Sequence, residues 1–271
     1  MWNIEYLVTI IVIVICFVFF FYKDQIDKFV NSDFKEGISL DDTNIFLINM
    51  EKNTDRLNFF VEQYLQSDLK SKTFNRINAV DGKKIDIKDY VSPRAYKEII
   101  EIEKTGFRTK HYQLTRGAIG CYLSHIAAYT AIANGDKPYG LVFEDDVKIK
   151  PNIWKKLNNY LMTIPNNWDM LLNSCYCISC NKSDGYYDVK RFFWTHCLLL
   201  KKETAQKILD ILQNKLIEQQ IDSELSDIAS DGKIRLYCLK ESLATQGGHF
   251  STDIQMPLKI VSGINPYSSI Y

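Results

Sequence analysis

The most continuous apolar stretch of the chain lies near its start, where residues 6–22 carry no charge and Thr9 supplies the only internal hydroxyl. As a helix this stretch spans about 25 Å, close to the lower limit for crossing the hydrocarbon core of a bilayer. It therefore predicts a single transmembrane anchor. A cleaved signal peptide and a very apolar core helix are the alternatives. A signal peptide has a basic start and small residues at its end, whereas Glu5 precedes this run and Phe19–Tyr22 closes it.

The charges beside this run bear on its orientation. Lys23 and Lys28 follow it, and no Lys or Arg precedes it. By charge bias this places the rest of the chain in the cytosol. Two lysines are too few to settle the topology, so we expect a single-pass membrane protein and leave the side of the membrane open.

After the anchor, the polar and apolar pattern indicates a charged stem at 23–42, a catalytic body at 43–262 and a short tail at 263–271. Within the body, short apolar runs alternate with stretches of helical period, while the mixed, charged segment 85–110 is typical of a mobile flap. This alternation predicts an α/β fold with a mostly parallel central sheet covered on both faces. The predicted strands are 44–49, 73–80, 139–143, 168–173, 192–200 and 234–239, and the predicted helices are 57–65, 118–133 and 203–217.

The charge balance argues against a nucleic-acid partner, and the cysteine spacing argues against a structural zinc site. Lys plus Arg and Asp plus Glu both total 33, so there is no basic excess to bind a nucleic-acid backbone. Cys175, Cys177 and Cys180 are close enough for a metal clip, but only His196 lies nearby as a further ligand. A structural zinc site needs a second ligand pair, so paired or buried cysteines are favoured over zinc.

Three consecutive carboxylates, Glu144, Asp145 and Asp146, come directly after the apolar strand predicted at 139–143. Open α/β sheets bind ligands at the carboxyl ends of their strands. Clustered like charges need a cation or hydrogen-bond donors to offset them, and oxygen ligands of this kind suit Mn²⁺ or Mg²⁺. A solvated acidic turn is the alternative, and the triplet alone leaves the two interpretations equally supported.

The triplet is one of several segments whose order and spacing match one family. The others are Ile48-Asn-Met-Glu-Lys-Asn-Thr-Asp-Arg56, Ala79-Val-Asp-Gly82, Leu114-Thr-Arg-Gly-Ala-Ile-Gly-Cys-Tyr-Leu-Ser-His125, the Ile221-Asp222 pair and Gln246-Gly-Gly-His-Phe-Ser-Thr-Asp-Ile254. Together they span 44–254 and resemble glycosyltransferase family 25, which holds bacterial lipooligosaccharide galactosyltransferases and procollagen galactosyltransferases. Ala118 stands where the family's pattern has an acidic residue.

The resemblance implies a GT-A type nucleotide-sugar-binding fold, a UDP-sugar donor, usually UDP-galactose, and transfer with inversion at the anomeric carbon. Such a reaction needs in-line attack by an acceptor hydroxyl, a carboxylate base and a cation that stabilises the departing UDP. The implied metal ligand is Asp146, with Glu144 and Asp145 sharing metal and ribose contacts and His249 completing the coordination. A lone His beside glycines is otherwise more often a plain loop residue.

The base and the donor-binding residues are assigned with structural alternatives beside them. Asp222 is the first choice for the base, then Asp253, then Asp169, and each is otherwise an ordinary surface or capping carboxylate. The remaining candidates lie where a nucleotide docks on strand ends and a helix start. Arg56 can instead form a surface ion pair, Gly117 and Gly120 can serve close packing, and His125 can be a core histidine. These donor-site candidates are Asn49, Arg56, Asp81, Gly82, Gly117, Gly120, Ser124 and His125.

Three functions fit this set of residues. The favoured one is a hexosyltransferase that acts on a glycan, glycolipid or protein hydroxyl, with 85–110 and the aromatic stretch 186–194 as candidate acceptor walls. The second is a catalytically silent member of the same fold that serves as a binding or scaffold protein, against which the intact acidic cluster argues. The third is a nucleotide-sugar hydrolase that uses water as its acceptor.

Overall fold

The computed structural model describes residues 37–110, 113–247 and 250–259 of the chain, which divides into two units after Glu36. The apolar run at 6–22, most of the predicted stem and the tail at 263–271 therefore lie outside the described residues. Across the described ranges, no helix is both long and apolar enough to cross a bilayer.

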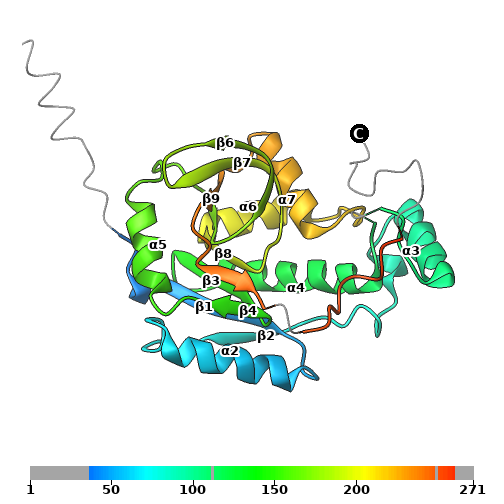
Figure 1. The fold of residues 1–271 in the computed structure, drawn as a ribbon. Coiled ribbons are helices and arrows are strands. Elements are labelled where there is room, and N and C mark those ends of the chain that lie inside the picture. The colour runs from blue at the N-terminus through cyan, green and yellow to red at the C-terminus, as the bar shows by residue number, and fades with distance from the viewer. Residues whose placement is uncertain (1–36, 111–112, 248–249, 260–271) are drawn as a thin grey trace, which may run out of the picture. The chain divides into compact units, whose positions relative to one another are not determined.

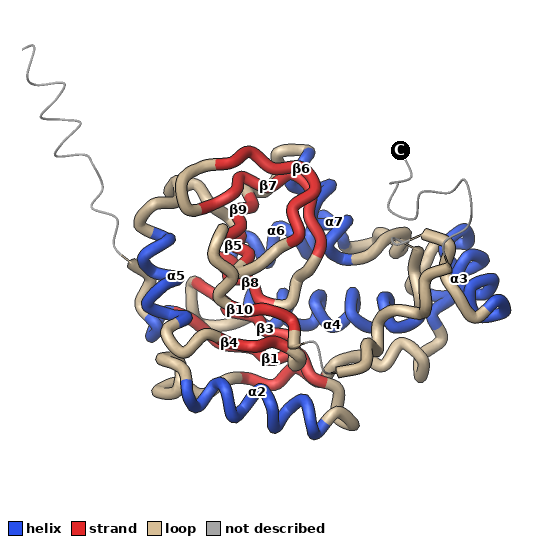
Figure 2. Tube along the Cα trace, in the orientation of Figure 1, coloured by secondary structure: helices blue, strands red, loops and turns tan. Residues whose placement is uncertain are grey.

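One mixed sheet organises the body (Figures 1 and 2). The described part of the chain places eight strands in it, in the order β2-β1-β3-β8-β5-β9-β7-β6. Neighbours are parallel in β2-β1-β3 and in β5-β9, whereas β8 is antiparallel to both β3 and β5, and β7 is antiparallel to β9 and β6. The α/β class is thereby confirmed. The strands are β1 Thr43–Asn49, β2 Asn75–Asn78, β3 Tyr139–Glu144, β5 Met170–Leu172, β6 Tyr176–Lys182, β7 Tyr186–Phe193, β8 Cys197–Lys201 and β9 Leu236–Leu239.

A second, two-stranded sheet lies next to the acidic triplet. It pairs β4 (Val147–Ile149) antiparallel with β10 (Ala244–Gln246), so that Gln246 lies opposite Val147. This pairing brings a late segment of the chain back to the end of β3. Glu144 ends β3, and Asp145 and Asp146 connect it to β4 of the second sheet.

Helices cover both faces of the main sheet (Figure 1). Side chains of α3, α4, α6 and α7 share one apolar core with one face of the sheet, and side chains of α2 and α5 share a second core with the other face. The helices are α2 Thr54–Gln66, α3 Pro93–Thr105, α4 Arg116–Ala133, α5 Ile153–Leu161, α6 Lys202–Leu212 and α7 Ile221–Ser230, with short 3₁₀ turns η1 Leu40–Asp42 and η2 Ile87–Asp89.

The sequence of β1 explains its place inside the sheet. Phe46 and Ile48 enter the core beneath α4, while Ile45 and Leu47 enter the core beneath α2. Alternate residues of a strand point to opposite faces, so a strand covered on both sides needs a continuous apolar run. Each such fully buried side chain contributes about 1.5–3 kcal/mol to stability.

The fold differs from the expected local structure in three places. The segment 85–110, expected as a mobile flap, contains α3, which begins after the Ser92 N-cap, buries Ala95, Ile99 and Ile102, and is followed by Gly106 in the left-handed conformation. The helix predicted at 203–217 ends at Leu212. The run 192–200 is not one strand. It breaks at Trp194, whose φ of 83° is incompatible with continued pairing, and so separates β7 from β8.

Candidate functional site

The parallel strands β1, β2 and β3 end at the same edge of the sheet, and a cleft opens there. We call it the strand-end cleft; its empty volume is about 710 Å³. Its walls are the turn after β1, the turn after β2, the start of α4, the acidic triplet after β3 and the late segment at 252–254. All the sequence-predicted donor-site residues except Asn49 and Gly120 line this cleft. The structure thus brings together the segments that were assigned separately.

Asp145 is held by two side chains from the β1 end of the cleft. Asn49 Nδ2 donates to Asp145 Oδ2 at 2.6 Å, and Arg56 donates from Nη1 to Asp145 Oδ1 at 3.1 Å. Both carboxylate oxygens therefore already have partners. Burial raises the pKa of Asp145, while the hydrogen bonds from Asn49 and Arg56 act in the opposite direction. In this arrangement Asp145 fixes Arg56 rather than offering a free ligand oxygen.

Asp146 is the carboxylate with an oxygen to spare. Its side chain is buried, Gln246 Nε2 donates to Oδ2 at 3.0 Å, and Oδ1 has no hydrogen-bond partner among the described residues. Burial raises the pKa of Asp146, and the nearby charge of Glu144 raises it further. A buried, unpartnered carboxylate oxygen is costly unless a cation or another donor joins it. This environment fits a bound metal ion.

Glu144 is bound from α4 and from the segment after Trp194. His125 Nε2 lies 3.0 Å from Glu144 Oε1, and Thr195 Oγ1 donates to the same oxygen at 3.0 Å. Burial opposes ionisation of Glu144, but these hydrogen bonds and the charge of His125 lower its pKa overall. His125 is fully buried and also contacts the Tyr129 hydroxyl at 3.4 Å. It therefore orients Glu144 at the floor of the cleft.

A second set of potential metal ligands uses a residue that the sequence interpretation passed over. Ligand atoms of Cys121, His125 and Glu144 lie within 4.8 Å of one another. Burial raises the pKa of the Cys121 thiol well above its usual range, which disfavours the thiolate that binds metal. Of the two sets, Asp146 with Glu144 fits a hard cation better. His249, the third predicted ligand, lies outside the described residues.

The glycines of the cleft allow backbone segments to meet. A Cβ on Gly82 would lie 1.8 Å from the Arg116 carbonyl oxygen, and one on Gly117 would lie 2.1 Å from the Asp253 carbonyl oxygen. Ser124 stabilises the contact between the turn after β2 and α4. Its hydroxyl accepts from Val80 N at 2.8 Å and donates to the Gly120 carbonyl. The close-packing alternative thus accounts for these glycines. Their contacts position the cleft walls.

Charged groups surround the mouth of the strand-end cleft. Lys52 Nζ lies 3.0 Å from Asp81 Oδ2, and the hydrogen bond from Lys52 lowers the pKa of Asp81. Arg56 lies 3.3 Å from Asp253, which also accepts from Asn53 Nδ2 at 3.0 Å. Two cations therefore face a cleft rich in carboxylates. An anionic ligand that carries its own cation would satisfy both kinds of charge.

A second cleft adjoins the first through shared walls at Cys121, Glu144 and Gln246. We call it the Trp194 cleft; its empty volume is about 630 Å³, and Asp222 at the start of α7 lines it. Asp222 Oδ2 accepts from Trp194 N at 3.3 Å. Burial raises the pKa of Asp222 to about 6, partly offset by backbone hydrogen bonds, in the range useful to a general base.

The other two candidates for the base are placed less favourably. Asp253 is engaged by Arg56 and Asn53 in the strand-end cleft, so both residues compete with a substrate proton for its carboxylate. Asp169 precedes β5, which runs parallel to β3, and therefore lies at the opposite end of the sheet from Glu144. It accepts from Arg235 N at 2.7 Å, a capping role.

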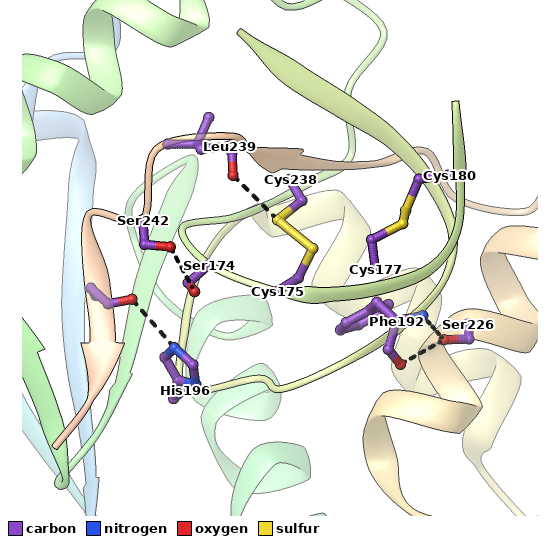
Figure 3. Close-up of a disulfide and its surroundings, with 11 residues drawn as sticks. Ser174, Cys175, Cys177, Cys180, Phe192, His196, Ser226, Cys238, Leu239 and Ser242 are labelled. Carbon is purple, nitrogen blue, oxygen red and sulfur yellow. Dashed lines mark hydrogen bonds between the residues drawn. A yellow bond between two sulfur atoms is a disulfide. The ribbon is translucent and has the colours of Figure 1, made fainter. Parts of the chain in front are cut away.

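Disulfides join residues of β6, of β9 and of the turn before β6 (Figure 3). Cys175 pairs with Cys238 of β9, and Cys177 pairs with Cys180 within β6. Of the two alternatives to a zinc site, paired or buried cysteines, these four are paired, while Cys121 and Cys197 are free thiols. Figure 3 also shows Ser226 of α7 bonded to the backbone of Phe192, which ties α7 to β7. The Cys175–Cys238 bond thus joins the turn before β6 to β9.

Contributors to the site that escaped the sequence interpretation include Lys52, Cys121, Thr195 and Gln246. Cys121 had a usable signal, because it lies four residues before His125 on one helix and so shares its face. Gln246 reaches Asp146 only through the pairing of β10 with β4. Thr195 reaches Glu144 only because the chain turns sharply at Trp194. No local sequence pattern predicts the contact of Gln246 with Asp146 or that of Thr195 with Glu144.

Comparison with known proteins agrees with this geometry. The family model described as glycosyltransferase family 25 (LPS biosynthesis protein) matches residues 42–187, just over half of the chain. Procollagen galactosyltransferase 2 of Homo sapiens is 28% identical over 133 residues, which cover 47% of this chain and 20% of that protein. A glycosyltransferase 25 family member of Anopheles gambiae is 28% identical over 131 residues, with 48% and 20% covered. The chain thus spans about a fifth of the length of these relatives.

Among solved structures, similarity is found to a glycosyltransferase involved in glycosylation of the major capsid of PBCV-1. That comparison gives a TM-score of 0.42 at 13% identity and covers 77% of this chain and 94% of the other. The family match is the stronger finding. This chain belongs to glycosyltransferase family 25.

Proposed function

We propose that this chain is a metal-dependent, inverting hexosyltransferase of GT-A type that moves galactose from UDP-galactose onto a hydroxyl of a glycan, glycolipid or protein. The observation that carries the proposal is the pair of adjoining clefts that share Glu144. Asp146 offers a free buried oxygen on one side of this wall, and Asp222 lies on the other. Donor and acceptor thus have separate sites that meet at one carboxylate.

Asp146 and Glu144 would hold Mn²⁺ or Mg²⁺, and such an ion neutralises a diphosphate as it leaves. Side chains of the protein bind the donor and accept the proton. Arg56 and Lys52 attract the anionic donor, while Asn49 and Asp145 keep Arg56 in place. Asp222 accepts the proton of the attacking hydroxyl, for which its pKa of about 6 is well suited.

The location of the protein is part of the proposal. We infer that residues 6–22 attach it to a membrane and that the body faces an oxidising compartment. The two disulfides support the second inference, since such bonds persist outside the cytosol. This conflicts with the charge bias of Lys23 and Lys28. We give the disulfides more weight, because that bias rests on two residues.

Calorimetry on the full-length, metal-stripped protein tests the function. UDP-galactose should bind in the presence of Mn²⁺, bind far more weakly without it, and lose the metal effect in Asp146→Ala. A folded protein that binds no UDP-sugar under either condition would instead fit the silent scaffold. Release of UDP at an equal rate with and without acceptors would fit the hydrolase.

A further inference from the structure

Two large aromatic side chains lie exposed beside the Trp194 cleft. Trp194 is 47% exposed and lines the cleft, and Tyr176 is 55% exposed. Their ring centroids are 5.7 Å apart, and Tyr176 in turn stacks on Phe193 at 6.3 Å. We call the Trp194 and Tyr176 rings the aromatic ledge. Grouped exposed aromatics next to a cleft are typical of a binding surface.

The backbone holds Trp194 in an unfavourable conformation. Its φ of 83° lies in the left-handed region, which bulky residues rarely adopt. The Trp194 amide is anchored on Asp222 at 3.3 Å, and Thr195 next to it is anchored on Glu144. The strained turn therefore places an indole ring and two carboxylates around one space.

Tyr176 is held in place by covalent bonds on both sides. Cys175 before it is bonded to Cys238 of β9, and Cys177 after it is bonded to Cys180. In the sheet, Tyr176 is the register partner of Phe193, the residue before Trp194. The backbone segments that carry the two rings are thus held together. Such rigidity reduces the entropy lost when a ligand binds.

The surroundings of the ledge combine an apolar face with polar groups. Thr195, Asp222 and Gln246 line the same cleft as the indole. A pyranose ring matches this combination, because one face presents C–H groups to an aromatic ring while its edge carries hydroxyls. The side chains of serine and threonine carry a hydroxyl but offer no ring face. The ledge therefore favours a saccharide over a bare protein hydroxyl.

We propose that Trp194 and Tyr176 form a pyranose-binding ledge, so that the acceptor is a saccharide whose attacking hydroxyl lies at Asp222. The acceptor role rests on the proposed transferase function. Binding of the saccharide itself does not, and it can be measured without catalysis. The two ideas can therefore fail separately.

Saturation-transfer NMR on the full-length protein in a sugar-free detergent tests the ledge. The probes are the methyl pyranosides of glucose, galactose and N-acetylglucosamine, with a serine- and threonine-containing peptide as the contrast. At least one pyranoside should receive saturation at its C–H protons, and its Kd should rise at least about fivefold in Trp194→Ala and in Tyr176→Ala. Trp194→Phe should retain most of the affinity.

Tyr90→Ala is the matched control, because Tyr90 is an aromatic of similar exposure, 43%, that lines neither cleft. Circular dichroism and thermal melting establish that each variant is folded. Absence of pyranoside binding to the folded wild type, or equal binding by Trp194→Ala, overturns the ledge. UDP-galactose binding in the same samples reports on the transferase separately, so a positive pyranoside result without donor binding would retain the ledge alone.

Discussion

Arg56 stands among three carboxylates and shows how one residue can organise a charged site. Its guanidinium lies 3.1 Å from Asp145, 3.8 Å from Asp146 and 3.3 Å from Asp253. It also packs over the Phe250 ring at 5.3 Å. A planar donor with several N–H groups can serve such partners simultaneously, which a lysine cannot. Even so, Asp146 keeps one oxygen unpaired.

Removing the negative charge of the Asp146 carboxylate tests whether Asp146 is a metal ligand. Asp146→Asn should reduce transfer from UDP-galactose at least about 100-fold, because the developing charge on UDP loses its stabilisation. The measurement is the transfer rate across a Mn²⁺ titration. Asp136→Asn, at a carboxylate whose side chain is 76% exposed, should leave the rate unchanged. An unchanged rate in Asp146→Asn would rule out the assigned ligand.

The pKa of Asp222 predicts a pH dependence. A base with a pKa of about 6 is protonated in more acidic solution, so transfer should fall as the pH drops below about 6. Asp222→Asn should lose about 10²–10⁴-fold in rate. A pH profile of kcat for the wild type, with no inflection near 6, would exclude Asp222 as the base.

The same residue should lower stability when it is ionised. Its pKa is raised from 3.8 to about 6 in the folded state, so folding favours the protonated form. The resulting loss of stability is absent below about pH 4 and complete above about pH 6. Asp222→Asn should therefore melt at a higher temperature than the wild type at pH 7.5, with little difference near pH 3.5. Melting curves at both values measure this, and a pH-independent difference would contradict it.

Among the elements, α4 does the most to shape the strand-end cleft. Its first turn meets the turn after β2 at Gly82 and Gly120, and its inner face carries Ser124 and His125 to the cleft. The helix is apolar around most of its surface and is correspondingly buried. A small shift of α4 would therefore move several site residues together.

Adding one methyl group at this contact tests the arrangement. Gly82→Ala places a Cβ 1.8 Å from a backbone oxygen, so we expect about 1–3 kcal/mol of destabilisation and weaker UDP binding. Gly106→Ala is the control, since a Cβ there meets nothing within 4 Å and only the left-handed backbone is strained. It should cost about 1 kcal/mol and leave UDP binding unchanged. Urea unfolding and calorimetry measure the two effects.

At the scale of the whole molecule, the Cys175–Cys238 bond links the turn before β6 to β9 across 63 residues of sequence. Closing a loop of that length should contribute up to about 4 kcal/mol to the free energy of unfolding. Cys175→Ser should thus lower stability by more than Cys177→Ser, which opens a loop of only 3 residues. Denaturant unfolding without reductant measures this, and equal losses would contradict it.

Several parts of the molecule could be predicted from sequence because they depend on local patterns. Continuous apolar runs such as 44–49 and 139–143 indicate buried strands, and the helical period at 118–133 indicates a buried helix. The acidic triplet follows its strand directly, so its place at the sheet edge follows as well. Helix α3 also had a signal, Ser92-Pro93 at its start and Gly106 at its end, which its charged composition masked.

Other features depended on contacts between distant segments. The sequence by itself determined the α/β class, the family and the location of the acidic triplet, since each rests on short-range pattern and order. Only the tertiary structure decided that Asp146 keeps a free oxygen while Asp145 does not, and that Asp222 rather than Asp253 faces the second cleft. The physical reason is that partners come from β10, α2 and the turn at Trp194, and their positions are fixed by packing and sheet register rather than by neighbours in the chain.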